Sequence, residues 1–173
     1  AKVNLSLHIT GRRDDGYHTL LTRMQKLDLC DLLELDLTDR GNIEISCDSK
    51  EIPVDSRNLA AQAAIQFFDR CGSRAGSGLS ISLKKRIPVA AGLGGGSSDA
   101  AAVLKGLNEM LDGPFSEDEL FDVGRQLGAD VPFFISDQAA VIATGIGDCL
   151  TKIAHVKNYH FVLVNPGFSV NTK

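Results

Sequence analysis

Aromatic residues and cysteines are scarce in this sequence. Among 173 residues there is no tryptophan, there are two tyrosines, and only 6% of the residues are aromatic. The four cysteines, Cys30, Cys47, Cys71 and Cys149, are widely and irregularly spaced and form no CxxC pair. Zinc sites and disulfide frameworks depend on closely spaced or patterned cysteines, so neither is predicted. Reduced thiols in a cytoplasmic protein are the simplest interpretation.

Long apolar runs and an excess of positive charge are also absent. No apolar stretch approaches the roughly 20 residues of a membrane-spanning helix, and the N-terminus lacks the basic and apolar regions of a signal peptide. The formal net charge of −4 argues against a general binder of nucleic acids or membrane surfaces. The expected partner is therefore a small polar molecule, which a local basic pocket can still bind.

The most informative segment is PVAAGLGGGSSDAAA, at residues 88–102. Its glycines, at 92 and 94–96, allow the backbone amides to approach a ligand closely. Ser97 and Ser98 favour the start of a helix, because a serine side chain can cap the first turn. The N-terminus of a helix presents free amides and a partial positive charge, so the segment predicts a loop that binds phosphate.

Other interpretations of this glycine-rich segment are less favourable. A flexible linker is more often flanked by polar, unpatterned sequence, whereas this loop lies between an apolar strand and an amphipathic helix. No lysine follows the glycines at the spacing of a Walker A loop. Ser97 also stands where a GxGxxG motif counted from Gly92 needs its third glycine, so neither familiar nucleotide loop is present.

Hydrophobic periodicity predicts an α+β fold with a largely antiparallel sheet covered on one face by helices. Alternating residues predict a half-buried strand at 3–9, with Lys2 and Asn4 as neighbours on its polar face. Further strands are expected at 18–29, 32–37, 42–47, 79–87, 133–135, 139–143 and 161–164. Helices are expected at 59–71, from about Ser97 until Gly113 and Pro114 close the segment, and from a Ser116–Glu119 capping box to about Leu127.

Several charged and hydroxyl residues are candidates for phosphoryl-transfer chemistry, which needs neutralised charge, a metal ion and a group that orients the attacking oxygen. Lys2 could supply a cation, although an ordinary surface lysine is the commoner case. Asp130 lies at a junction between elements, where a turn-forming aspartate is an equal alternative. Ser97 and Ser98 are candidates for contacts with phosphate or Mg²⁺, while Asp99 would repel phosphate and is interpreted as structural.

Tyr17 and His18 follow a charged GRRDDG turn. Together they offer an aromatic ring and a hydrogen-bonding group, a pair suited to a flat heterocycle. Packing at the start of a strand is the alternative role for both residues.

Three segments, AKVNLSLHITGRRDDGYH, PVAAGLGGGSSDAA and LGADVPFF, occur in an order that resembles the GHMP kinase superfamily of small-molecule kinases. The first and third resemble one branch, which acts in the non-mevalonate isoprenoid pathway. The resemblance implies a ribosomal-S5-like ATP-binding domain at 1–155 and the start of a second domain at 156–173. It also implies a reaction, transfer of the γ-phosphoryl group of ATP to the 2-hydroxyl of 4-diphosphocytidyl-2-C-methyl-D-erythritol, with Mg²⁺ required.

The resemblance also implies roles for individual residues. Asp130 would be the general base and Lys2 would stabilise charge beside it. Asn4, Tyr17 and His18 would contact the substrate, with Tyr17 stacking on cytosine and His18 bonding its edge. The implied ATP-binding residues are Asn58, Lys85, Gly92, Leu93, Gly94, Gly95, Gly96, Ser97 and Ser98, and Ser98 is also the candidate metal ligand.

One expected motif is missing. The third glycine-rich motif of the superfamily does not occur in the sequence, and we expect both ends to be cut. Another GHMP kinase with a different alcohol substrate is the nearest alternative. A non-catalytic S5-like module that binds nucleotides or nucleic acids is the more distant one. The sequence does not distinguish a monomer from a homodimer.

Overall fold

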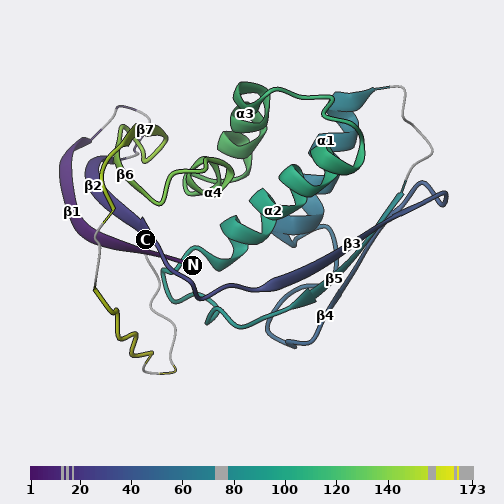
Figure 1. Cartoon of the computed structure of the whole chain (residues 1–173), viewed down its shortest axis with the longest axis horizontal. Coiled ribbons are helices and arrows are strands. Elements are labelled where there is room, and N and C mark those ends of the chain that lie inside the picture. Colours follow the sequence, from purple (N-terminus) through teal and green to yellow (C-terminus); the bar gives the residue numbers. More distant parts are fainter. Residues whose placement is uncertain are drawn as a thin grey trace.

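The computed structural model describes residues 1–12, 14, 16, 18–72, 78–155, 159–165 and 167. Figure 1 shows a long β-hairpin and its neighbouring strands at one end of the molecule. At the other end, helices pack over a second sheet. The α+β class is as predicted, but the single predicted sheet is two sheets.

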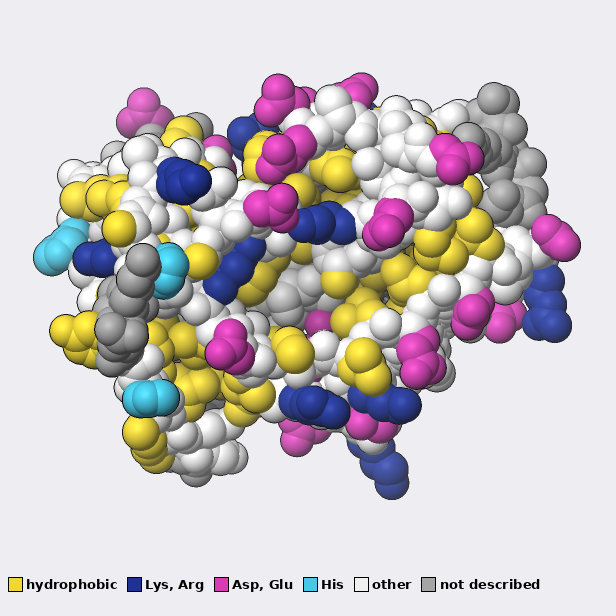
Figure 2. Space-filling view, viewed as in Figure 1, with side chains coloured by type: hydrophobic (Ala, Val, Ile, Leu, Met, Phe, Trp, Pro, Cys, Tyr) yellow, Lys and Arg dark blue, Asp and Glu magenta, His cyan; other side chains and the backbone are white. Residues whose placement is uncertain are grey.

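The first sheet has four antiparallel strands in the order β1-β2-β6-β7. Their bounds are β1 Lys2–Arg12, β2 His18–Lys26, β6 Ala140–Thr144 and β7 Cys149–Lys152. β1 is an edge strand, and its pairing with β2 is irregular between Asn4 and Ser6. The strand at 3–9 was correctly predicted, but its burial was not, because Leu7 and Ile9 are 58% and 67% exposed. Hydrophobic side chains are visible over this end of the molecule in Figure 2.

The second sheet has three strands in the order β3-β5-β4. They are β3 Leu32–Thr38, β4 Ile43–Cys47 and β5 Gly78–Lys84. β3 runs antiparallel to β5, whereas β4 runs parallel to it. All three strands were predicted, although the strand expected at 79–87 ends at Lys84 in the structure. The local pattern carries no information on which strands share a sheet.

Three helices, α1 Leu59–Cys71, α2 Gly95–Met110 and α3 Glu117–Leu127, form the main core together with the second sheet. The approach of α2 to β3 is close, since a Cβ atom on Gly106 would lie 2.6 Å from Leu35 Cδ1. The predicted bounds of α1 are confirmed, as is the Ser116–Glu119 capping box of α3. Among the residues that the structure describes, none of the helices combines the length and apolar character that a membrane span needs.

Three elements differ from their predictions. The apolar run at 133–135 belongs to a short helix, α4 Val131–Ile135, because Pro132 favours a first helical turn and a short apolar run does not distinguish helix from strand. Strand β7 was missed, since its sequence CLTK has little apolar character. Phe161–Val164 forms no strand in the described structure. The exposure of its side chains alternates as it would in a strand, with Val162 87% and Leu163 40% exposed.

The start of α2 is also a correction. The N-cap is Gly94, in the left-handed conformation, and it provides no side-chain cap. Ser97 and Ser98, predicted as caps, lie inside the first turn, where the Ser98 hydroxyl donates a hydrogen bond to the Gly95 carbonyl oxygen at 2.7 Å. The chain enters the helix earlier than predicted because the glycine adopts positive φ at low cost.

Candidate active site

The glycine loop, residues 88–94, connects the segment after β5 to the N-terminus of α2. Three of its residues, Ala90, Gly92 and Gly94, have positive φ values of 54°, 72° and 71°. Because Gly94 provides no side-chain cap, the amides of residues 95–97 have no hydrogen-bond partner in the described part of the chain. These amides are the groups with which a helix N-terminus binds an anion.

Gly94 is needed for its lack of a side chain as well as for its backbone conformation. A Cβ atom there would lie 2.8 Å from Phe134 Cε2 and 3.1 Å from Lys2 Cγ. The loop therefore packs directly against α4 on one side and the first strand on the other.

Lys2 lies against this loop and is not an ordinary surface lysine, the commoner case for this residue type. Its side chain is only 8% exposed, and its ammonium lies 3.0 Å from Asp130 Oδ2. Its backbone amide also donates a hydrogen bond to the Leu93 carbonyl oxygen at 2.9 Å. The structure thus brings together the loop and both predicted catalytic residues.

Asp130 is the N-cap residue of α4, but its side chain accepts no capping hydrogen bond. The carboxylate pairs with Lys2 and remains 31% exposed. Asp130 does lie in a turn, closed by the hydrogen bond from the Val131 amide to the Gly128 carbonyl oxygen, but its side chain is engaged by Lys2. Because Asp130 is accessible while Lys2 is buried, the carboxylate of this ion pair can contact a reacting hydroxyl group.

The position of Lys2 is fixed by a short hydrogen-bond chain across β1 and β2. The Lys2 ammonium donates to Asn4 Oδ1 at 2.7 Å, which confirms that the two residues are neighbours. The Asn4 amide nitrogen donates to Thr22 Oγ1, and that hydroxyl donates to the Ser6 carbonyl oxygen, each at 2.7 Å. Nothing in the sequence pattern indicated Thr22, which lies two residues from Met24, the β2 partner of Asn4, and therefore on the same face of the sheet.

A pocket of about 340 Å³ opens beside the glycine loop. The side chains of Ile52, Leu59 and Val89 form apolar parts of its wall, and residues 88–97 contribute loop backbone. Apolar walls beside free amides suit a nucleotide, whose base is flat and whose phosphates are anionic.

Two residues implied to bind ATP have other partners in this structure. Asn58 caps α1 by accepting a hydrogen bond from the Ala60 amide at 2.9 Å, and its side-chain amide donates to the Pro53 carbonyl oxygen at 2.8 Å. Lys85 lines the loop pocket, but its ammonium is paired with Asp31 and Asp99.

The pairing of Lys85 forms a buried ion triad, defined here as Asp31, Lys85 and Asp99. The Lys85 Nζ lies 2.5 Å from Asp31 Oδ2 and 2.8 Å from Asp99 Oδ2, and the three side chains are 1–7% exposed. Burial raises the pKa of Asp99 to about 6, against the opposing effect of Lys85. Burial also acts to raise the pKa of Asp31, but hydrogen bonds from the Ile87 amide and Lys85 lower it overall. Sequence reasoning missed Asp31, which no local motif marks.

The substrate residues are only partly placed. Asn4 lies beside Lys2, whereas His18 is exposed at the opposite end of the β1–β2 hairpin, where it pairs with Arg12. Tyr17, predicted to stack on cytosine, lies outside the described residues. The domain boundary predicted after residue 155 falls beside other residues that are not described.

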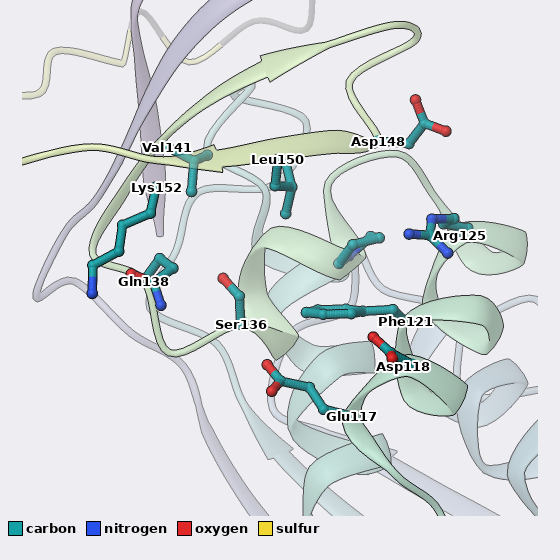
Figure 3. Close-up of a pocket in the computed structure, with 11 residues that line it drawn as sticks. Glu117, Asp118, Phe121, Arg125, Ser136, Gln138, Val141, Asp148, Leu150 and Lys152 are labelled. Atoms are coloured by element: carbon teal, nitrogen blue, oxygen red, sulfur yellow. The ribbon is translucent and has the colours of Figure 1, made fainter.

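A second pocket, of about 380 Å³, lies between α3, α4 and the β6–β7 hairpin (Figure 3). Two of its polar side chains already form hydrogen bonds within the chain. Arg125 donates to Asp122 at 2.8 Å, and the Ser136 hydroxyl donates to the Phe133 carbonyl oxygen at 2.9 Å. Neither the glycine loop nor the Lys2–Asp130 pair lines it. The pocket at the loop is therefore the better candidate for the active site.

Comparison with known proteins gives the family. A sequence profile described as the GHMP kinases N terminal domain matches residues 58–145, which include the glycine loop and Asp130. The chain belongs to the GHMP kinase family. Its fold agrees with this assignment, since a solved mevalonate kinase with 17% sequence identity superposes with a TM-score of 0.63 over 88% of this GHMP chain and 55% of that one.

More similar GHMP kinases share a single name. The 4-diphosphocytidyl-2-C-methyl-D-erythritol kinase of Desulfotalea psychrophila is 53% identical over all of this chain, which covers 58% of that protein. The protein of the same name from Syntrophotalea carbinolica is 50% identical over 99% of the chain and 60% of its own length. A crystal structure of 4-(cytidine 5'-diphospho)-2C-methyl-D-erythritol kinase is 40% identical, with a TM-score of 0.75 over 89% of this chain and 53% of that one. The chain thus spans little more than half the length of these relatives.

Proposed function

We propose that this chain carries the ATP-binding and catalytic half of a kinase that phosphorylates the 2-hydroxyl of 4-diphosphocytidyl-2-C-methyl-D-erythritol, a step toward isoprenoid precursors. The observation that carries the proposal is the Lys2–Asp130 ion pair at 3.0 Å beside the glycine loop. The names of the relatives at 53% and 50% identity support the choice of substrate. Because those relatives are longer, activity is proposed for a protein that also contains their remaining part.

The glycine loop binds the phosphates of ATP in this proposal. The free amides of residues 95–97 donate hydrogen bonds to phosphate oxygens, and the N-terminal end of α2 favours their negative charge. The apolar side chains of Ile52, Leu59 and Val89 line the adjoining pocket and are the natural contacts for adenine.

Asp130 accepts the proton of the attacking hydroxyl group. The hydroxyl oxygen then forms a bond to the γ-phosphorus, the bond from that phosphorus to the bridging β-γ oxygen breaks, and ADP leaves with the electron pair. The Lys2 ammonium, 3.0 Å from the carboxylate, orients it and supplies positive charge where negative charge builds up. Asn4 holds the ammonium in place through its 2.7 Å hydrogen bond.

Mg²⁺ is compatible with the residues near the loop. In the described residues, no group of three or more histidine, cysteine or acidic side chains forms a ready metal site. Magnesium at nucleotide sites takes most of its ligands from phosphates and water, so such a group is not required. The Ser98 hydroxyl donates its hydrogen to Gly95 and keeps an oxygen lone pair for the metal. When bound, the ion would neutralise charge on the phosphates of ATP.

The cytidine end of the substrate is assigned to Tyr17 and His18. His18 pairs with Arg12 at the far end of the β1–β2 hairpin from Lys2, roughly 33 Å away along an extended strand. This separation is longer than the substrate, so the role of His18 rests on the family resemblance and not on the hairpin conformation of this structure. The exposed apolar residues of β1, including Leu7 and Ile9, lie between these two ends.

A substrate comparison tests this function. The chain would be fused to the part of the D. psychrophila relative that lies outside the match, and ATP-dependent phosphorylation would be measured by ADP release. We expect turnover with the cytidylyl substrate, and none above background with mevalonate, phosphomevalonate or homoserine. A preference for one of the other alcohols would assign the chain to another GHMP kinase.

A further inference from the structure

The buried ion triad of Asp31, Lys85 and Asp99 joins the two ends of the glycine loop. Lys85 and the two residues after it lead into the loop from β5, and Asp99 lies just beyond it in α2. Asp31 comes from a third place, the connection between β2 and β3. One cluster therefore joins the segment before β3, the segment after β5 and the helix that begins at the loop.

The segment that leads into the loop is held mainly through its backbone. Asp31 Oδ1 accepts hydrogen bonds from the amides of Arg86 and Ile87, at 2.5 Å and 2.8 Å. The Lys85 amide donates to Asp48 Oδ1 at 2.9 Å. Three successive amides are thus fixed by carboxylates from elsewhere in the fold.

The beginning of α2 is held by the same lysine side chain. Lys85 Nζ lies 2.8 Å from Asp99 Oδ2 and 3.3 Å from the place where a Cβ atom of Gly95 would be. The Lys85 ammonium therefore packs directly beside the first turn of α2. That turn provides the free amides assigned to phosphate.

Between these two ends the loop has little support of its own. Within residues 88–94, the backbone hydrogen bonds to other parts of the described chain are one from the Lys2 amide to Leu93 and one from the Ser98 amide to Gly94. Ala90 has a positive φ of 54°, which is unfavourable for a residue with a side chain. A loop with such a backbone keeps its shape only when the surrounding structure imposes it.

The arrangement of the triad does not maximise the stability of the fold. Asp99 Oδ1 is buried without a hydrogen-bond partner in the described structure, an arrangement that costs free energy. With both carboxylates ionised the triad also carries a net negative charge, so it is unsuited to contact phosphate directly. Its contribution to nucleotide binding must come through the backbone that it holds.

We propose that Asp31, Lys85 and Asp99 are positioning residues that fix the two ends of the glycine loop, so that its amides are in place before ATP binds. This role rests on the proposed function. It differs from direct contact with ATP, the role that family resemblance implied for Lys85. A triad that only stabilises the core would change the melting temperature without selectively changing the affinity for ATP.

The test uses the fusion protein with two variants. The first is the double variant Lys85→Met/Asp99→Asn, which keeps the net charge of the triad and removes its link across the loop. The second is Asp99→Asn, a milder change of similar size, in case the double variant fails to fold. Dissociation constants for a non-hydrolysable ATP analogue would be measured by calorimetry, together with kcat and the KM of each substrate.

We expect the double variant to bind the analogue at least about tenfold more weakly and to raise the KM for ATP, while the KM for the alcohol stays within about twofold. Asp99→Asn should change both ATP parameters in the same direction by a smaller factor. Two control variants, Lys105→Met in an exposed ion pair and Ser116→Ala in the α3 capping box, should leave the affinity for ATP unchanged. The second of these should also lower the melting temperature.

Two results would overturn the proposal in distinguishable ways. If Asp99→Asn, and the double variant where it folds, bind the analogue within about twofold of the unaltered fusion protein, the positioning role is wrong and the proposed function stands. If the unaltered fusion protein binds no ATP, the proposed function fails and the positioning role fails with it.

Discussion

Lys2 and Asp130 form an ion pair, with Nζ 3.0 Å from Oδ2, although they are far apart in the sequence. The same lysine donates its backbone amide to Leu93 in the glycine loop. One residue therefore fixes the distance between the proposed base and the proposed phosphate site. This relationship is the basis of the mechanism, and it can be tested from both sides.

Replacing Lys2 with methionine should reduce kcat of the fusion protein by about 100-fold or more, because it removes the positive charge beside Asp130. The stem of methionine still packs against the loop, and the backbone amide still bonds to Leu93. The dissociation constant for the ATP analogue should therefore change little. A variant that keeps normal turnover would exclude Lys2 from the mechanism, and Lys105→Met is the matched control for loss of a lysine charge elsewhere.

Gly94→Ala should destabilise the protein and weaken ATP binding. Alanine at φ 71° is strained, and its Cβ atom would also collide with Phe134 and approach Lys2. Gly113→Ala is a matched control, because Gly113 has a similar φ of 67° with no atom within 4 Å. In thermal unfolding, Gly94→Ala should lower the melting temperature more than Gly113→Ala. Equal losses would mean that close packing at Gly94 is unimportant.

Most elements could be predicted from the sequence because local patterns determine them. Residues at helical spacing between Asn58 and Gly72 define α1, and Ser116 with Glu119 marks the start of α3. The apolar run at 133–135 was misassigned, since short runs fit either a strand or a helix and Pro132 was not recognised as a helix start. The division into two sheets depends on pairing between distant strands, which no local pattern encodes.

The candidate site was predictable where residue types alone indicated it. The glycine loop, Lys2 and Asp130 were each identified, and the structure brings them together. The triad was not identified, because Asp31 is distant in sequence and its role appears only when Lys85 is seen to be buried. The caps predicted at Ser97 and Ser98 failed for a simpler reason, namely that a glycine can start a helix without a side-chain cap.

Asp99→Asn should change the pH dependence of stability. The native pKa of Asp99 is about 6, above its ordinary value of 3.8, so between these pH values the folded protein holds a proton that the unfolded chain releases. The stability contributed by Asp99 is therefore present at low pH and lost as pH rises through 6. The asparagine side chain of the variant has no proton to exchange in this range.

As pH rises from 5 to 7.5, the unfolding free energy of the variant should therefore increase relative to that of the parent chain by on the order of 1 kcal/mol. Lys85 and Asp31, which face Asp99, are retained in both proteins. Urea unfolding at the two pH values measures this difference. A difference that is independent of pH would show that Asp99 does not titrate in this range.

Ser116→Ala should cost about 1 kcal/mol of unfolding free energy, because it removes the side-chain cap of the Glu119 amide at the start of α3. The pocket at the glycine loop does not include this helix end. Urea unfolding should therefore show lower stability while calorimetry shows unchanged affinity for the ATP analogue. Loss of ATP affinity would indicate that α3 and the loop are coupled.

The most direct test of the phosphoryl-transfer site is the turnover of the Asp130→Asn variant of the fusion protein. We expect kcat to fall by at least about 100-fold, because asparagine cannot accept the proton of the hydroxyl group. The dissociation constant for the ATP analogue and the melting temperature should stay close to those of the unaltered protein, since the Asp130 side chain makes no capping hydrogen bond and is 31% exposed. Near-normal turnover in a folded Asp130→Asn variant would contradict the assignment of the base and with it the proposed mechanism.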